Sequence, residues 1–229
     1  MKKLLQGLGI LMMMITNVNA QAPSGMGASD PEAKKILDGV SNKFKTYKTV
    51  QAKFSLKIEN SAGKNLGVKT GNVYMKGSKY RITVTGQDIF SDGSNVWTYD
   101  KESNEVTISK LDPSANSLTP QKLFTNFYDK DFLYKLNGVV KMSGKNLKEI
   151  ELTPIDKTKA FFKVLVYVDV NSINTTKIFE KNGNRYTYST NSLTPNAAIS
   201  DAMFVFDEKK YPHNYSDFTN KSANIFSGC

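Results

Sequence analysis

Between residues 50 and 59, apolar and polar positions alternate one for one: Val50, Ala52, Phe54, Leu56 and Ile58 are separated by polar side chains. A repeat of two is typical of a strand with one buried and one wet face. The same alternation returns in residues 68–76, 80–84, 96–99, 106–108, 132–136, 147–153, 161–169, 176–180 and 185–190. Short turns such as Asp92-Gly93 and Asn182-Gly183 separate these segments. The pattern predicts an antiparallel meander of about ten or eleven strands.

Two segments instead repeat at spacings of three and four, which indicates helices. The first begins at Asp30, a good N-cap, with Pro31 at the first helical position. Its apolar stripe is Ala33, Ile36, Leu37, Val40, Phe44 and Tyr47. A shorter helix over residues 119–127 carries Leu123, Phe124 and Phe127. We therefore predict a mainly β (α+β) fold, in which both helices cover the apolar concavity of a strongly curved sheet or incomplete barrel.

The start of the chain has the three parts of a secretory signal peptide. Two lysines are followed by an apolar run over residues 4–15 and by small residues ending at Ala20. About a dozen apolar residues are too few to span a bilayer. We expect a cleaved signal peptide over residues 1–20, a flexible leader over 21–29, one domain over 30–207 and a polar tail over 208–229. No cysteine follows the cleavage site, so we expect an exported, soluble, unanchored protein.

Composition further limits the classes of function that the chain can have. The formal net charge is +10, carried almost entirely by lysine, since only Arg81 and Arg185 are arginines. Lysine is a poor bidentate reader of phosphates or bases, so the charge indicates solubility first and weak attraction to anionic membranes second; it argues against a nucleic-acid partner. Cys229 is the single cysteine and His213 the single histidine. An intramolecular disulfide and a zinc site built on several histidines are excluded.

Catalytic residues are scarce in this sequence, which has neither a nucleophile elbow nor a phosphate-binding glycine loop. Five acids fall in one hairpin region: Asp88, Asp92, Asp100, Glu102 and Glu105. Their positions fit turns and strand edges, while a glycan hydrolase built on a carboxylate pair stays an alternative. The many aromatic residues either fill the core or line a cavity for an apolar ligand, and composition favours the core. We expect no enzymatic activity, no cofactor and no metal.

The order of these pieces resembles the periplasmic outer-membrane lipoprotein carrier family, LolA. The matching segments run from residue 30 to residue 206. They are DPEAKKILDGVSNKFKTY, VQAKFSLKI, GNVYMKGSKYRITV, SDGSNVWTYD, TPQKLFTNF, ELTP and a late FVF. The resemblance implies a bent, incomplete barrel whose cavity takes the acyl chains of lipoproteins. It also implies transfer across the periplasm, from an inner-membrane lipoprotein-release ABC transporter to an outer-membrane acceptor, by a monomer.

On this resemblance, the apolar positions of the helices and first strands become candidates for the acyl-chain cavity. They are Ile36, Leu37, Val40, Phe44, Phe54, Leu56, Tyr80, Ile82, Trp97, Leu123, Phe124 and Phe127. Which face of each strand points inward is left open by the alternation alone.

The chain departs from the family at one position. Proteobacterial members place an arginine after the strand lysine, implied to hold the helices closed, where this chain has Gly77. We hypothesise that Arg81, four residues further on, substitutes for it. The departure leaves room for a carrier of another amphiphile, such as a glycolipid or a pigment.

Overall fold

The computed structural model describes residues 29–111, 120–121, 128–211 and 214–217. The predicted signal peptide, most of the leader, His213 and Cys229 lie outside these residues. So do Leu123, Phe124 and Phe127, and with them most of the second predicted helix.

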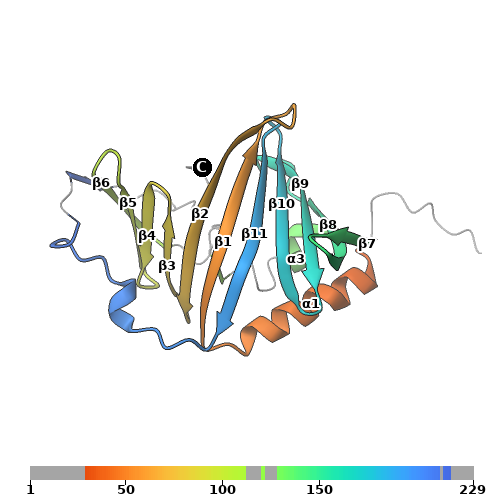
Figure 1. Cartoon of the computed structure of the whole chain (residues 1–229), viewed down its shortest axis with the longest axis horizontal. Coiled ribbons are helices and arrows are strands. Elements are labelled where there is room, and N and C mark those ends of the chain that lie inside the picture. Colours follow the sequence, from red (N-terminus) through yellow and green to blue (C-terminus); the bar gives the residue numbers. More distant parts are fainter. Residues whose placement is uncertain (1–28, 112–119, 122–127, 212–213, 218–229) are drawn as a thin grey trace, which may run out of the picture.

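Eleven antiparallel strands form one continuous curved sheet, which confirms the predicted fold class (Figure 1). They are β1 (Thr49–Glu59), β2 (Asn65–Lys76), β3 (Lys79–Val84), β4 (Gln87–Ser91), β5 (Asn95–Asp100), β6 (Glu105–Lys110), β7 (Phe132–Met142), β8 (Lys145–Pro154), β9 (Phe161–Asp169), β10 (Ser172–Glu180) and β11 (Arg185–Pro195). Sequential hairpins build both halves, and β1 joins them by pairing with β11. A short strand that the sequence does not predict, β12 (Asn214–Asp217), adds to β6 in parallel.

The first helix, α1 (Pro31–Lys45), begins where predicted. The Asp30 carboxylate accepts hydrogen bonds from the backbone N–H groups of Glu32 at 2.8 Å and Ala33 at 3.4 Å. Its second oxygen accepts from the Leu136 N–H at 3.1 Å, which ties the helix start to β7. Two shorter helical segments, α3 (Tyr128–Asp131) and the 3-10 helix η1 (Asp201–Phe204), connect to the sheet.

Replacing Asp30 with alanine is expected to lower the free energy of unfolding by about 1 kcal/mol at pH 7. Hydrogen bonds from the Leu136 and Glu32 N–H groups lower the pKa of Asp30. A lowered folded pKa makes this stabilisation complete above the carboxyl's ordinary pKa and removes it as the pH falls through the folded value. When urea unfolding is measured at stepwise lower pH, the difference in free energy of unfolding between Asp30→Ala and the wild type should therefore become smaller. Asp30→Asn keeps a cap oxygen without a charge, so it should lower the free energy of unfolding at pH 7 by less than Asp30→Ala does. A difference between Asp30→Ala and the wild type that stays the same at acid pH would contradict this account.

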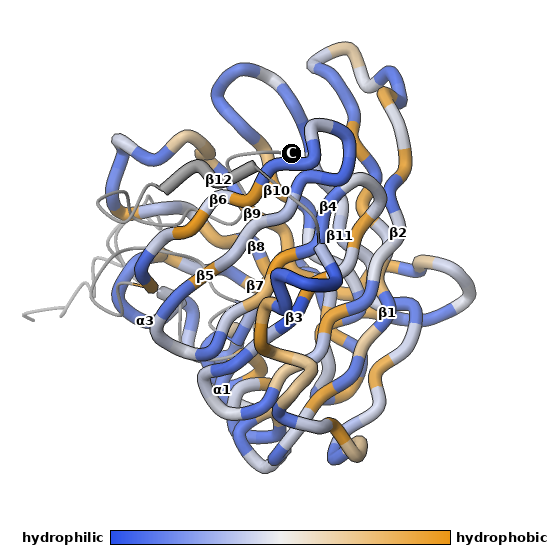
Figure 2. The backbone as a smooth tube through the Cα atoms, turned by 90° about the vertical axis from the view of Figure 1, so that its left-hand side faces the viewer, coloured by the Kyte–Doolittle hydropathy of each residue, from blue (hydrophilic) through white to orange (hydrophobic). Residues whose placement is uncertain are grey.

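The strand register divides the side chains between two faces. On the face that we call inner, the residues Ala52, Val73, Ile82 and Ile89 follow one another across four neighbouring strands. Helix α1 covers the other half of this face, where buried Ile36, Leu37 and Val40 pack with residues of β7 to β10 such as Ile150 and Val166. Hydrophobic and hydrophilic positions alternate along most strands, as the sequence predicts (Figure 2).

The opposite face, which we call outer, has an apolar cluster of its own between β3 and β6. Phe90 is 1 % exposed, and its ring centroid lies 5.6 Å from that of Phe206 and 5.4 Å from that of Tyr211. Both partners belong to the segment that follows η1, which packs on this part of the sheet. Tyr211 lies within the tail that the sequence predicts to be polar, yet it packs on the sheet. Strand β4 is thus buried on both of its faces.

Candidate functional site

The apolar inner face between α1 and the first strands is the candidate site. A cluster of Val50, Ala52, Val73, Met75, Tyr80, Ile82, Ile89 and Val96 is contacted by Phe54 from β1 and by Phe44 and Tyr47 from the end of α1. Tyr80 is fully buried, and burial raises the pKa of its phenol, so the hydroxyl stays neutral at physiological pH. Helix α1 therefore contacts both halves of the inner face, with Leu37 at one end and Phe44 at the other.

A cavity of about 160 Å³ lies where the end of α1 meets this cluster. Its walls combine the apolar or aromatic residues Phe44, Tyr47, Val50 and Met75 with the polar residues Lys45, Lys48, Thr49 and Gln121. This volume is below the range of roughly 300–1,000 Å³ that is usual for small-molecule sites. Much of the remaining inner face is filled by side chains of α1, since Leu37 and Val40 are 2 % and 4 % exposed. An elongated apolar ligand would need α1 to move.

Gln121 closes one wall of the same cavity. Its amide Nε2 donates hydrogen bonds to the backbone carbonyls of Gly77 at 3.2 Å and Lys79 at 3.0 Å. These two hydrogen bonds join residues 120–121 to the turn between β2 and β3. The resemblance implies an arginine at position 77 that holds the helices closed. In this chain the Gly77 carbonyl accepts a hydrogen bond instead, and the Gln121 amide donates it.

Most of the described candidates for the cavity lie on the inner face. Ile36, Leu37 and Val40 belong to the cluster under α1, and Phe44, Phe54, Tyr80 and Ile82 belong to the cluster of the first strands. Leu56 is 1 % exposed and shares the register of the inner face.

Trp97 and Arg81 lie on the outer face instead. Trp97 pairs with Phe90 and packs in the outer cluster. The Arg81 guanidinium lies 4.6 Å from the Phe90 ring centroid, donates to the Tyr211 hydroxyl at 3.0 Å and approaches Asp88 to 3.8 Å. These contacts hold the segment after η1 on the sheet. Within the described residues Arg81 points away from α1, so its contacts do not support a latch role.

The hairpin acids have structural partners. Asp92 accepts hydrogen bonds from the backbone N–H groups of Ser94 and Asn95 at 2.8 and 2.7 Å. Asp100 accepts from the N–H groups of Ser103 and Glu102, and these bonds lower its pKa. A general acid needs the opposite shift. The Asp88 carboxylate lies 2.7 Å from the Lys101 ammonium. The hydrogen bonds of Asp92 and Asp100 stabilise turns, and Asp88 forms an ion pair.

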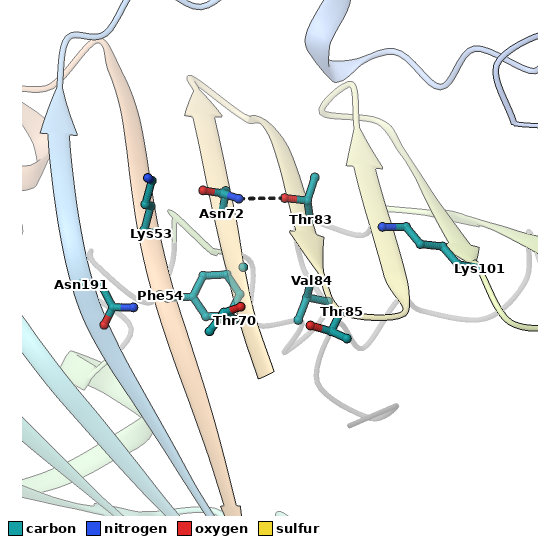
Figure 3. A pocket seen from close by; sticks show the side chains of 10 residues that line it. Lys53, Phe54, Thr70, Asn72, Thr83, Val84, Thr85, Lys101 and Asn191 are labelled. Atoms are coloured by element: carbon teal, nitrogen blue, oxygen red, sulfur yellow. Dashed lines mark hydrogen bonds between the residues drawn. The ribbon is translucent and has the colours of Figure 1, made fainter. Parts of the chain in front are cut away.

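A larger hollow of about 450 Å³ lies across β1, β2 and β3, towards their far ends from α1 (Figure 3). Its walls are mainly polar and include the lysines Lys53 and Lys101. Asn72 donates to the Thr83 hydroxyl across it at 3.3 Å. Phe54 is its one aromatic wall, and the ring packs over Gly71, where a Cβ would approach it to 2.7 Å. This polar setting does not suit an acyl chain.

Among the described residues there is neither a cluster of metal-binding side chains nor a helix suited to cross a bilayer. No group of three or more His, Cys, Asp or Glu side chains in that part of the chain could hold a metal ion. Among the helices that the structure describes, none combines the length and apolarity needed to cross a bilayer.

Comparison with known proteins assigns the chain to a family. The model of the family described as "Outer membrane lipoprotein carrier protein LolA" matches residues 45–207. This chain is a member of the LolA family. An outer-membrane lipoprotein carrier protein of Pseudomonas putida is 28% identical over 166 residues, covering 71% of this chain and 77% of that one. A carrier protein of Cupriavidus necator is 25% identical over 198 residues, covering 83% and 88%.

Similarity at the level of the fold extends to a solved structure of an uncharacterised conserved protein from Thermus thermophilus. It has a TM-score of 0.53 at 12% identity and covers 81% of this chain and 99% of that one. The family match and the sheet together confirm the resemblance to LolA.

Several residues of the site are not among the sequence candidates. Val50, Ala52, Val73 and Met75 line the inner face, and their alternation with polar neighbours was the available signal. Once one inner residue of a strand is known, the period of two fixes the others. Gln121 carried no signal, because an amide at a helix start is ordinary until its acceptors are known.

Proposed function

We propose that this protein is a periplasmic carrier that shelters the acyl chains of lipoproteins between α1 and the inner face and moves them from the inner to the outer membrane. The observation that supports the proposal is that α1 and the residues directly after it contact an apolar cluster on each half of the inner face. Exposing an acyl chain to water costs about 0.8 kcal/mol for each CH₂ group. A carrier that crosses an aqueous space therefore has to cover the chain with apolar surface.

Closure of the empty site is part of the mechanism. The buried Ile36 and Leu37 occupy the surface that an acyl chain would take, so the closed state competes with the cargo and weakens net binding. Release at an acceptor then does not have to overcome the full burial energy of the chain. The Gln121 hydrogen bonds to Gly77 and Lys79 stabilise the closed state without raising the affinity for cargo.

The same proposal implies one membrane partner that loads the carrier with lipoprotein and another that unloads it. An inner-membrane ABC transporter that releases lipoproteins would load the carrier, and an outer-membrane acceptor would unload it. No bond is made or broken in such a transfer, so the carrier needs neither a catalytic group nor a cofactor.

The proposal is tested by purifying the protein from its native periplasm without detergent and identifying co-purified molecules by mass spectrometry. We expect acylated proteins, and far fewer of them with Ile82→Gln, which places an amide on the inner face. Arg81→Gln, one residue earlier and on the outer face, is the matched control and should retain the cargo. Circular dichroism checks that both variants are folded. A free glycolipid or pigment would replace lipoprotein as the cargo, and cleavage of a glycan would contradict a carrier.

A further inference from the structure

The tips of β1, β2, β10 and β11 form the end of the sheet that is far from α1 (Figure 1). The turns between β1 and β2, β8 and β9, and β10 and β11 meet there: the Lys181 N–H donates to the Ala160 carbonyl at 2.9 Å, and Gly183 packs on Ser61. We call the group beside these turns the tip patch; it consists of the exposed Leu66, Val68 and Phe162 and the half-buried Lys163, Lys177 and Arg185.

The register places these side chains on one face. Phe179 of β10 pairs with Lys163 of β9 on one side and with Arg185 of β11 on the other. Lys57 of β1 likewise pairs with Thr187 of β11 and with Val68 of β2. Paired residues in an antiparallel ladder project to the same side, so the patch is continuous from β9 to β2.

Three cations surround a single aromatic ring at the centre of the patch. The Lys163 ammonium lies 4.8 Å, the Lys177 ammonium 5.5 Å and the Arg185 guanidinium carbon 5.8 Å from the Phe179 centroid. The Glu59 carboxylate lies among these cations, 3.0 Å from the Lys57 ammonium and 3.8 Å from the Lys177 ammonium, and Glu149 and Glu151 of β8 lie on the same face. The Lys57 hydrogen bond and the nearby cations lower the pKa of Glu59, as expected in a positive field. The patch keeps a surplus of positive charge.

Apolar side chains on the same patch are left in water. Leu66 is 57% exposed, Val68 58% and Phe162 50%. They make up three of the seven large hydrophobic residues that are exposed in the described part of the chain. The Phe162 ring leans on Phe179 with their centroids 6.2 Å apart, so it stands beside the cations. Exposed apolar groups gathered in one place mark an interaction surface.

We propose that the tip patch docks this protein on the surface of an anionic lipid bilayer. Lysines and an arginine would lie among the anionic headgroups, and Phe162, Leu66 and Val68 would enter the boundary with the acyl chains, a combination typical of interfacial binding. An acidic protein would match the charge but would leave three aliphatic and aromatic side chains without a role. The patch lies at the opposite end of the sheet from α1, so docking leaves the inner-face site free.

The test is sedimentation of the full chain with vesicles of phosphatidylcholine containing or lacking phosphatidylglycerol. We expect binding to the anionic vesicles only, with release at high salt. The double substitution Lys163→Glu and Lys177→Glu should weaken binding at least about tenfold, since each lysine near an anionic surface contributes a factor of about five. Phe162→Ser should weaken it several-fold with the charge unchanged.

The matched control is Lys141→Glu with Lys148→Glu, which makes the same change of charge on β7 and β8, away from the tip patch. Binding within about twofold of the wild type is expected for it and for the inner-face variant Ile82→Gln. Equal binding to neutral vesicles, or equal losses in the patch and control pairs, would overturn the proposal. So would retention on immobilised polyglutamate without binding to anionic vesicles, which would assign the patch to an acidic protein. The vesicles carry no lipoprotein, so such failures leave the proposed cargo untouched.

Discussion

A disulfide that joins α1 to the turn between β9 and β10 is expected to abolish acyl-chain uptake, and its reduction to restore uptake. Gly39 of α1 lies beside Asn171 of this turn: a Cβ at residue 39 would lie 3.0 Å from the Asn171 Oδ1 and 3.8 Å from its Cγ. Cysteines at both positions are therefore within reach of a disulfide. In the closed state the cavity between the end of α1 and the first strands measures about 160 Å³, so holding α1 in place should exclude an acyl chain from the inner face.

The measurement is binding of a fluorescent acylated peptide by the Gly39→Cys, Asn171→Cys protein, oxidised and then treated with dithiothreitol. Cys229→Ser is included in the background, since Cys229 is the native cysteine. Gly39→Cys alone, treated with the same oxidant, controls for the substitution in the helix. Binding by the oxidised double variant at the level of the reduced one would show that α1 does not need to move.

Phe90→Ala is expected to lower the free energy of unfolding by about 3–5 kcal/mol, the usual cost of removing a buried phenylalanine side chain. The ring is 1 % exposed and contacts Phe206, Tyr211 and the Arg81 guanidinium. Its loss should also release the segment that covers the outer face. Acyl-chain binding by the protein that remains folded should not change, because Phe90 lies on the other side of the sheet from Ile82 and Tyr80.

Chemical unfolding followed by tryptophan fluorescence measures the effect, since Trp97 lies in the same cluster. Phe162→Ala, which truncates a half-exposed phenylalanine of β9, is the control and should cost about 0.5 kcal/mol. If Phe90→Ala left stability intact but removed acyl-chain binding, the division of the molecule into a binding face and a structural face would be wrong.

The local signals of the sequence were sufficient for α1 and for most of the strands. Asp30 and Pro31 define the start of the helix, and the stripe from Ala33 to Val40 is its buried side. Periodicity of this kind depends on backbone geometry and on the burial of one face, both of which are local.

The face to which each strand residue belongs could not be predicted in the same way. Residues 89–91 are buried on both sides of β4, because the segment containing Phe206 and Tyr211 returns to cover the outer side. A period of two separates the faces but does not say which one is covered. Trp97 was therefore a candidate for the cavity although it packs in the outer cluster, and the Gln121 contact depends on chain segments 42 residues apart.

The order of strands has a consequence for the life of the chain before it folds. Strand β1 lies in the middle of the sheet, yet one of its two neighbours is β11, and Ser55 and Asn191, which share a hydrogen bond, are 136 residues apart. The central seam cannot form until nearly the whole polypeptide is available, and long-range pairings of this kind are slow. A nascent chain that cannot complete its sheet stays unfolded, which would suit export through a narrow channel, as the predicted signal peptide implies.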